Sequence, residues 1–290
     1  CLIVACIPFD FFKKNALSLL IFSSFLCLIP HMPFLGIKIN GAARWIYAGF
    51  FFIQPVEILK PFFILMISSL ITRNKYQLHT TLWSVISICI ITTSILLLQP
   101  DFGQAVVLLL LSFIMFFTFY CKTKLLLLTS GIGASALFLI AIVKPYRLAR
   151  LLIFLDPWKD PLGKGFQIIQ SLIAIVNGSW LGVGIGKSTQ KIAYLPMQHT
   201  DFIFSIICEE IGLIGASILI MLYAALQITF IYIAFYTKDM YAKLFIIGCA
   251  LLIAFESSIN IFVISALLPT KGIGLPFISY GVSSIIGHSI

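Results

Sequence analysis

Charged residues are scarce in this sequence: they make up 10% of its 290 residues, and only ten of them are acidic. Hydrophobic residues make up 61%, and the mean hydropathy is +1.11. No soluble domain buries so much apolar surface in one core. The apolar residues fall into blocks of about 20, the length that crosses the hydrocarbon of a bilayer. The composition therefore excludes a soluble protein and predicts an all-α, polytopic helical membrane protein.

Two further absences exclude classes of site. The seven cysteines are odd in number, scattered and nearly all inside apolar blocks, so they form neither a disulfide framework nor a metal-binding cluster. The segment LGVGIGKS, residues 181–188, has Leu181 where a phosphate-binding loop needs glycine, which excludes nucleotide binding. The net charge of +9 then reflects topology and contact with membrane lipids, and no nucleic-acid partner is expected.

The sequence also lacks a methionine at its first position, and both of its ends fall inside apolar blocks. These features predict one integral membrane domain over residues 1–290 that is truncated at both ends. No internal repeat and no low-complexity tract is visible. Seven full spans and two partial ones are expected, with partial spans at 1–9 and from about 275 and full spans at about 15–33, 51–72, 79–98, 103–121, 125–143, 202–236 and 243–268.

Lysine and arginine residues in alternate short loops predict the orientation of these spans. Lys13, Arg73, Lys122 and Lys238 mark the cytoplasmic connections. A large loop at 144–200 is then extracytoplasmic, because long loops are translocated largely regardless of their charge. The other extracytoplasmic loops are 34–50, 99–102 and 269–274. Within the large loop, the apolar run at about 168–176 is too short to span and is expected to be interfacial or re-entrant.

The candidate site residues each have a structural explanation beside a functional one. Thr200 and Asp201, just before an apolar helix, are natural N-cap residues, and capping and a functional role are equally favoured. For Asp101, in QPDFGQ, capping of the next helix is the favoured explanation. Arg44 and Trp45, in NGAARWI, fit snorkelling and aromatic anchoring at the lipid boundary.

The remaining candidates lie in apolar blocks or in a broken turn. Glu57 and Lys60, one turn apart near the outer end of a span, form either an ion pair or a contact to a charged ligand. Glu209 and Glu210 are expected deeper in a span, protonated or hydrogen-bonded. Lys271 lies in a turn rich in proline and glycine. The predicted topology gathers the charged candidates at one face, which favours an active site.

Six ordered motifs resemble those of the SEDS family (shape, elongation, division, sporulation) over essentially all residues. They are NGAARWI, QPVEILK, QPDFGQAVVLL, YRLARLLIFLDPWKDPLGKGFQIIQSLIAI, GIGKSTQKIAYLPMQHTDFIFSIICEEIGLIG and LLPTKGIGLPFISYG. Within the family, the QK before YLP and Lys271 resemble the members that act in division. Departures from the family pattern are Met197, Gln104 and Val282.

The resemblance implies a ten-helix fold and a peptidoglycan glycosyltransferase that polymerises lipid II, the undecaprenyl-pyrophosphate-linked disaccharide peptide, during septal cell-wall synthesis and division. It further implies the bacterial cytoplasmic membrane, a class B penicillin-binding transpeptidase as partner, and other divisome proteins. By motif, Asp201 matches the essential aspartate of the family. Arg44, Trp45 and Lys271 match residues of its cavity.

This chemistry needs one base and several cations, because pyrophosphate leaves as a stable anion. Asp201 is therefore predicted as the general base, oriented by His199 and Thr200, in an inverting displacement. Arg44, Lys271 and Arg147 would hold the pyrophosphates. A divalent cation, Mg²⁺ or Mn²⁺, would serve the same purpose, although the sequence assigns no ligands to it.

Two other classes of function stay open at this point. One is a flippase for the same lipid-linked sugar, although transporters place charged groups near the midplane of repeated halves. The other is a non-catalytic scaffold that recruits a transpeptidase.

Overall fold

The computed structural model describes residues 6–32, 36–39, 42–47, 49, 52–73, 77–120, 131, 133, 153–163, 165–193, 200–270 and 272–289. Six helices in this part of the chain are long and apolar enough to cross a bilayer. They are α2 (Phe9–Leu28, extended by the 3₁₀ turn Ile29–His31), α3 (Pro55–Arg73), α4 (Leu78–Leu98), α5 (Phe102–Tyr120), α10 (Ile203–Tyr236) and α11 (Met240–Ile264). The helical membrane fold is confirmed, and the span expected at 125–143 lies outside the described residues.

The chain divides into two compact units, and each is described by itself. The first comprises Cys1–Cys121, Ile228–Ile253 and Gly281–Ile290. Its centre is α3, which packs against α2, α4, α5 and the short helix α12 (Val282–Ser289). Leu59, Phe63 and Ile67, on successive turns of α3, are fully buried. Three polar residues of this helix, Glu57, Lys60 and Ser68, are buried with them.

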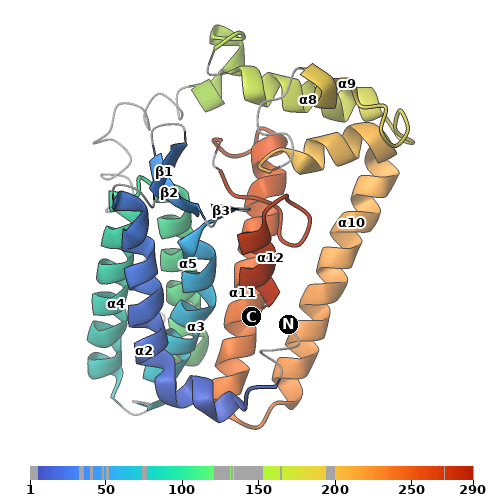
Figure 1. The fold of residues 1–290 in the computed structure, drawn as a ribbon. Coiled ribbons are helices and arrows are strands. Elements are labelled where there is room, and N and C mark those ends of the chain that lie inside the picture. The colour runs from blue at the N-terminus through green and yellow to red at the C-terminus, as the bar shows by residue number, and fades with distance from the viewer. Residues whose placement is uncertain are drawn as a thin grey trace. The chain divides into compact units, whose positions relative to one another are not determined.

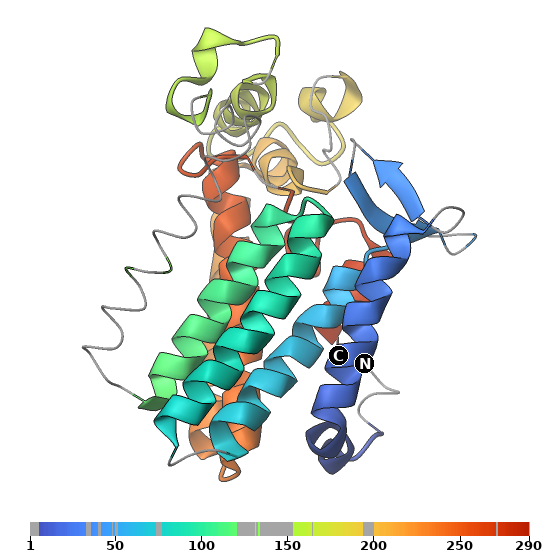
Figure 2. The ribbon, with the colours of Figure 1, turned by 90° about the vertical axis from the view of Figure 1, so that its left-hand side faces the viewer.

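A three-stranded antiparallel sheet follows α2, where the sequence predicted only a loop. Its strands are β1 (Gly36–Ile39), β2 (Ala42–Tyr47) and β3 (Phe52–Ile53), in the order β1-β2-β3. A register shift between Ile37 and Lys38 interrupts the pairing of β1 with β2. Figure 2 shows this sheet, in blue, beyond the end of α2. The sheet satisfies backbone groups that an irregular loop beside lipid would leave unpaired.

Side-chain contacts define the two ends of the first unit. At one end, His31 lies 3.2 Å from the Leu98 carbonyl, and Gln99 donates to the Cys27 carbonyl. At the other, Lys13 forms a 3.2 Å ion pair with Asp239. Two connections predicted to be extracytoplasmic, at 34–50 and 99–102, therefore share one end of this unit. Lys13 lies beside the 237–239 connection at the other end. Both placements agree with the predicted topology.

The second unit comprises Lys122–Gln227 and Ala254–Tyr280. It contains the 3₁₀ turn Pro157–Lys159, α8 (Phe166–Gly178), α9 (Thr189–Ala193) and parts of α10 and α11. Phe202, Phe204, Val263 and Leu275 belong to its buried core. The helix α8 contains the apolar run expected at 168–176 and is, as predicted, too short to span. Ser171 on α8 donates to the Ile264 carbonyl at 3.1 Å, which joins the large loop to the end of α11.

The helix α10 bends at Gly212, which corrects the expectation of one continuous span over 202–236. Gly212 has φ +72° and ψ −175°, a conformation that essentially only glycine adopts. Figure 1 shows residues 203–211 running across the end of the unit, beside α8 and α9, before the long part of α10 begins. Glu209 and Glu210 precede the bend, so they do not lie deep in the span as expected.

A loop from the same unit completes the hydrogen bonds that the bend breaks. The amides of Leu213 and Ile214, which a straight helix would pair with residues 209 and 210, donate to the Ser179 and Trp180 carbonyls at 2.9 and 3.2 Å. The Glu209 and Glu210 carbonyls instead accept from Val183 at 2.9 Å and Gly184 at 3.0 Å. The bend is therefore fixed by a loop inserted into the helical ladder.

Gly212→Ala is expected to lower the free energy of unfolding by about 2 kcal/mol because φ is positive there and a Cβ would lie 2.4 Å from the Gly182 amide nitrogen. Gly186→Ala is the control, because Gly186 also has φ +78° but its Cβ would meet nothing within 4 Å. Denaturant unfolding in detergent measures both. Equal losses of stability would show that the close contact at Gly212 is unimportant.

Candidate functional site

Asp201 lies in the second unit, in a turn that a buried asparagine joins to another loop. Asn260, on α11 and only 2% exposed, donates through Nδ2 to the Asp201 carbonyl and to the Ile273 carbonyl, each at 2.8 Å. One side chain thus ties the backbone on both sides of the site to a core helix. Asp201 itself is half-buried.

The loop at 272–280 approaches Asp201 closely. The Ser279 hydroxyl donates to the Thr200 carbonyl at 2.7 Å and accepts from the Leu275 amide at 2.6 Å. A Cβ on Gly272 would lie 3.1 Å from Asp201 Oδ2, so a residue without a side chain allows the loop to pass the carboxylate. The LPTKG motif and the HTD motif, about 70 residues apart, are therefore brought together.

The two aspartates differ in their position relative to the helix that follows each of them. The helix α10 begins at Ile203, so Phe202 precedes its first residue and Asp201 lies one position further out. By contrast, Asp101 directly precedes α5, and its carboxylate accepts from the Gln104 amide at 3.5 Å. The predicted cap at Asp101 is thus confirmed, whereas Asp201 does not directly precede α10, and its predicted role stays a prediction.

Arg44, on β2 of the first unit, holds the corner between α4 and α5. Its Nε donates to the Gln99 carbonyl at 3.1 Å and lies 3.8 Å from Asp101 Oδ2, and its guanidinium also donates to the Pro100 carbonyl. Burial raises the pKa of Asp101, while the Arg44 charge, the Gln104 amide and the Lys60 charge act in the opposite direction. Arg44 therefore has a structural role at this corner beside any role in binding.

Trp45 follows Arg44 directly in β2, so the two side chains point to opposite faces of the strand. Arg44 faces the α4–α5 corner, and Trp45, half-buried, belongs to the other face. The structure therefore separates these neighbours, which the sequence placed together at the lipid boundary.

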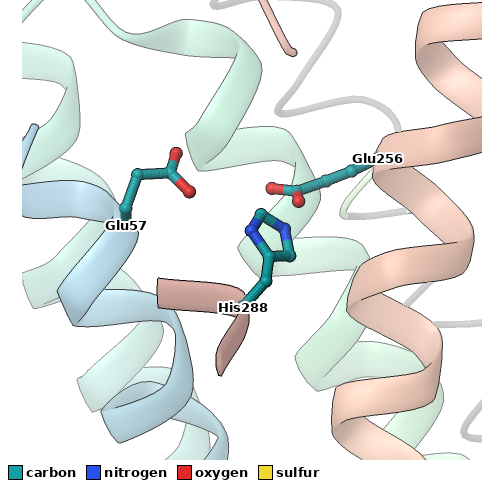
Figure 3. A group of neighbouring side chains, drawn as sticks. All are labelled: Glu57, Glu256 and His288. Carbon is teal, nitrogen blue, oxygen red and sulfur yellow. The ribbon is translucent and has the colours of Figure 1, made fainter. Parts of the chain in front are cut away.

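The predicted ion pair between Glu57 and Lys60 is present in the first turns of α3, with Lys60 Nζ 2.6 Å from Glu57 Oε1. Both residues are buried, at 5% and 2% exposure. Figure 3 shows the Glu57 carboxylate and the His288 imidazole directed toward each other, and their ligand atoms lie within 4.8 Å. A Cβ on Gly287 would lie 2.5 Å from the Glu57 carbonyl, so a glycine allows α12 to approach α3.

Glu209 is hydrogen-bonded, as predicted, but through the large loop rather than within a bundle. Its carboxylate accepts from Thr189 Oγ1 at 2.8 Å, from the Gln190 amide at 3.4 Å, and from Ser188 Oγ. Glu210 forms a 3.5 Å ion pair with Lys191.

His199, Lys271 and Arg147 lie outside the described residues, and their predicted roles stay predictions. The gathering of the charged candidates at one face also stays a prediction. Sequence reasoning missed Asn260, Ser279 and His288. Asn260 could have been identified from the sequence, because its side-chain amide lies inside the apolar block at 243–268 and a buried polar side chain requires a partner.

The sequence is similar to those of several known proteins. The sequence profile of the family described as "Cell cycle protein", which comprises FtsW, RodA and SpoVE, matches residues 1–290. The chain is 37% identical over 286 residues to the "Probable peptidoglycan glycosyltransferase FtsW" of Thioalkalivibrio sulfidiphilus, covering 95% of this chain and 70% of that protein. It is 40% identical over 280 residues to the protein of the same name from Wigglesworthia glossinidia brevipalpis, covering 94% and 73%.

Solved structures agree with the sequence relatives. A chain from "Structural coordination of polymerization and crosslinking by a peptidoglycan synthase complex" matches with a TM-score of 0.81 and 30% identity, over 99% of this chain and 82% of that chain. The rod shape determining protein RodA of Thermus thermophilus matches with a TM-score of 0.67 and 25% identity, over 97% and 76%. The match along the whole sequence, the level of identity and the common fold together show that the chain belongs to the FtsW/RodA/SpoVE family, the SEDS family that its motifs resemble.

Proposed function

We propose that this chain is a peptidoglycan glycosyltransferase that polymerises lipid II in cell division, and that Asp201 is its general base. The activity is the one printed for its FtsW relatives. The observation that supports the site is the position of the Asp201 carboxylate, beside Gly272 in a turn held by Asn260 and Ser279. Such a turn presents one carboxylate in a fixed place.

The reaction requires one proton acceptor. The 4-hydroxyl of one sugar attacks the anomeric carbon of another, the bond to the lipid pyrophosphate breaks, and the hydroxyl proton passes to a base. Asp201 accepts this proton. His199 and Thr200 orient the turn, and the Thr200 carbonyl accepts a hydrogen bond from the Ser279 hydroxyl. A single displacement of this kind inverts the anomeric centre.

The leaving pyrophosphate requires positive charge rather than a proton donor. Arg44, Lys271 and Arg147 supply it in this proposal. Trp45, Asp101, Glu57 and Lys60 line or support the lipid-linked substrate. Arg44 keeps guanidinium N–H groups beyond the two that bond to the Gln99 and Pro100 carbonyls, since it carries five.

Membership of the family supports a proposal for the setting of the reaction. The solved relative belongs to a peptidoglycan synthase complex that couples polymerization with crosslinking. A class B penicillin-binding transpeptidase is accordingly the proposed partner, together with other divisome proteins. The proposed location is the bacterial cytoplasmic membrane at the septum, with the loop at 144–200 on the extracytoplasmic face.

Labelled lipid II separates this function from its two alternatives. Purified protein in liposomes, with and without a cognate transpeptidase, is expected to produce glycan strands. Movement of lipid II between leaflets without strands would indicate a flippase. Neither strands nor movement in both preparations would favour a scaffold.

A further inference from the structure

The Glu209 carboxylate is the meeting point of the large loop and the short helical segment at 203–211. It is 1% exposed and accepts from the hydroxyls of Ser188 and Thr189 and from the Gln190 amide. Ser188 also accepts from the Lys191 amide at 3.1 Å and so caps α9. The beginning of α9 is therefore held on one buried carboxylate.

The backbone fixes the same contact from the other side. Val183 donates to the Glu209 carbonyl and Gly184 to the Glu210 carbonyl, where the bend at Gly212 has freed both acceptors. A Cβ on Gly182 would lie 2.2 Å from the Glu210 carbonyl, so the loop passes close to the helix. The loop at 179–190 thus meets residues 209 and 210 through both main chain and side chain.

The two partners of this contact, α9 and the 203–211 segment, precede and follow Asp201 in the sequence. Upstream, α9 ends at Ala193, eight residues before Asp201. Downstream, the helical segment that begins at Ile203 carries Glu209, eight residues after it. A carboxylate that joins α9 to this segment closes the chain around Asp201, and the closure restricts where the Asp201 turn can lie.

We propose that Glu209 is a positioning residue for the reaction: it holds α9 on the 203–211 segment and thereby holds the Asp201 turn in its productive place. This role rests on the proposed function of Asp201. The carboxylate itself does not touch the substrate. Its effect is on the geometry of the base, because errors of about 1 Å in the placement of a reacting group cost up to about a hundredfold in rate.

Glu209→Gln is the test. The side chain keeps its shape, but one oxygen becomes an NH₂ group that donates, so at least one of the three donors loses its acceptor. The kcat for lipid II polymerisation is expected to fall about tenfold to a hundredfold, with KM within about twofold of wild type. Hydrogen exchange of the amides in 182–193 is expected to become faster, since these amides depend on the contact.

Glu210→Gln is the matched control, because the neighbouring carboxylate makes a partly exposed 3.5 Å ion pair with Lys191. It is expected to lower kcat and to speed exchange much less than Glu209→Gln does, because Lys191 is 42% exposed in this pair and pairs that water reaches contribute little. Thr189→Val removes one donor without altering the buried carboxylate, and it is expected to cause a smaller loss of kcat. It provides the test if Glu209→Gln fails to fold. Added to Glu209→Gln, it should cause little further loss, because both act through one contact.

Wild-type kcat in Glu209→Gln would overturn the proposal, whether or not exchange at 182–193 changes. A higher KM with unchanged kcat would also overturn it, because that result indicates substrate contact. Asp201→Asn, assayed in parallel, separates the two ideas: if it keeps the wild-type rate, the assignment of the base fails, while exchange in Glu209→Gln still reports whether the contact forms.

Discussion

Asp201→Asn is expected to lower the rate of lipid II polymerisation about a thousandfold, the middle of the range for loss of a general base. The asparagine side chain has the same shape but cannot accept the hydroxyl proton. Asn260 and Ser279 donate to the main-chain carbonyls of Asp201 and Thr200, and the substitution keeps both carbonyls. These two bonds should keep the turn in place, and thermal unfolding in detergent checks that the variant is folded. Single-turnover assays with labelled lipid II measure the effect.

Asp239→Asn is the control, since this partly exposed aspartate pairs with Lys13 at 3.2 Å and belongs to a short connection between spans. It is expected to polymerise lipid II at the wild-type rate. Wild-type polymerisation by correctly inserted Asp201→Asn would refute the base. Equal losses in both variants would point to a general effect of lost charge.

Lys60→Met is expected to lower the free energy of unfolding by about 4 kcal/mol. It removes one partner of a buried pair and leaves the Glu57 carboxylate without its nearest positive charge, which typically costs 3–5 kcal/mol. Lys159→Met is a matched control: Lys159 and Asp156 are also an i,i+3 pair, 3.5 Å apart, but their side chains are 76% and 44% exposed. It should cost no more than about 0.5 kcal/mol. Denaturant unfolding compares the two.

The double variant Glu57→Met/Lys60→Met distinguishes stability from binding. Replacing both partners of a buried pair by apolar residues of similar size is often neutral, so most of the stability should return. Polymerisation should nevertheless stay about tenfold or more below wild type if the pair supports the substrate, since a lost charge contact costs at least about 1.4 kcal/mol. Full activity in this variant would leave the pair with a structural role alone.

The helical membrane fold was predictable because blocks of about 20 apolar residues have few other solutions. Each full span expected within the described residues has a helix in its place, although the one at 202–236 is bent at Gly212. The Glu57–Lys60 pair followed from the i,i+3 spacing. The sheet was missed, although Asn40-Gly41 between two short runs containing isoleucine and tyrosine is a recognised hairpin signal. The high hydropathy of the neighbouring segments obscured it.

The bend in α10 could not be predicted from local sequence. Residues 202–236 have continuous high hydropathy, and a single glycine in such a block is tolerated within a helix. The helix bends at Gly212 because a loop about 30 residues upstream forms hydrogen bonds there. This loop pairs with the carbonyls of residues 209 and 210 and with the amides of residues 213 and 214. Asn260 was missed for a similar reason, because its two acceptors lie 59 and 13 residues away.

The bend at Gly212 also sets the hydrophobic length of this part of the protein. A straight helix of 34 residues would be about 51 Å long, against about 30 Å of hydrocarbon. Hydrophobic mismatch costs fractions of a kcal/mol per Å, so an excess of about 20 Å would cost several kcal/mol or force a steep tilt. Residues 213–236 alone measure about 36 Å, which a modest tilt accommodates. A change in bilayer thickness is then met by the tilt of these residues, and the 203–211 segment that follows Asp201 is not drawn into the lipid.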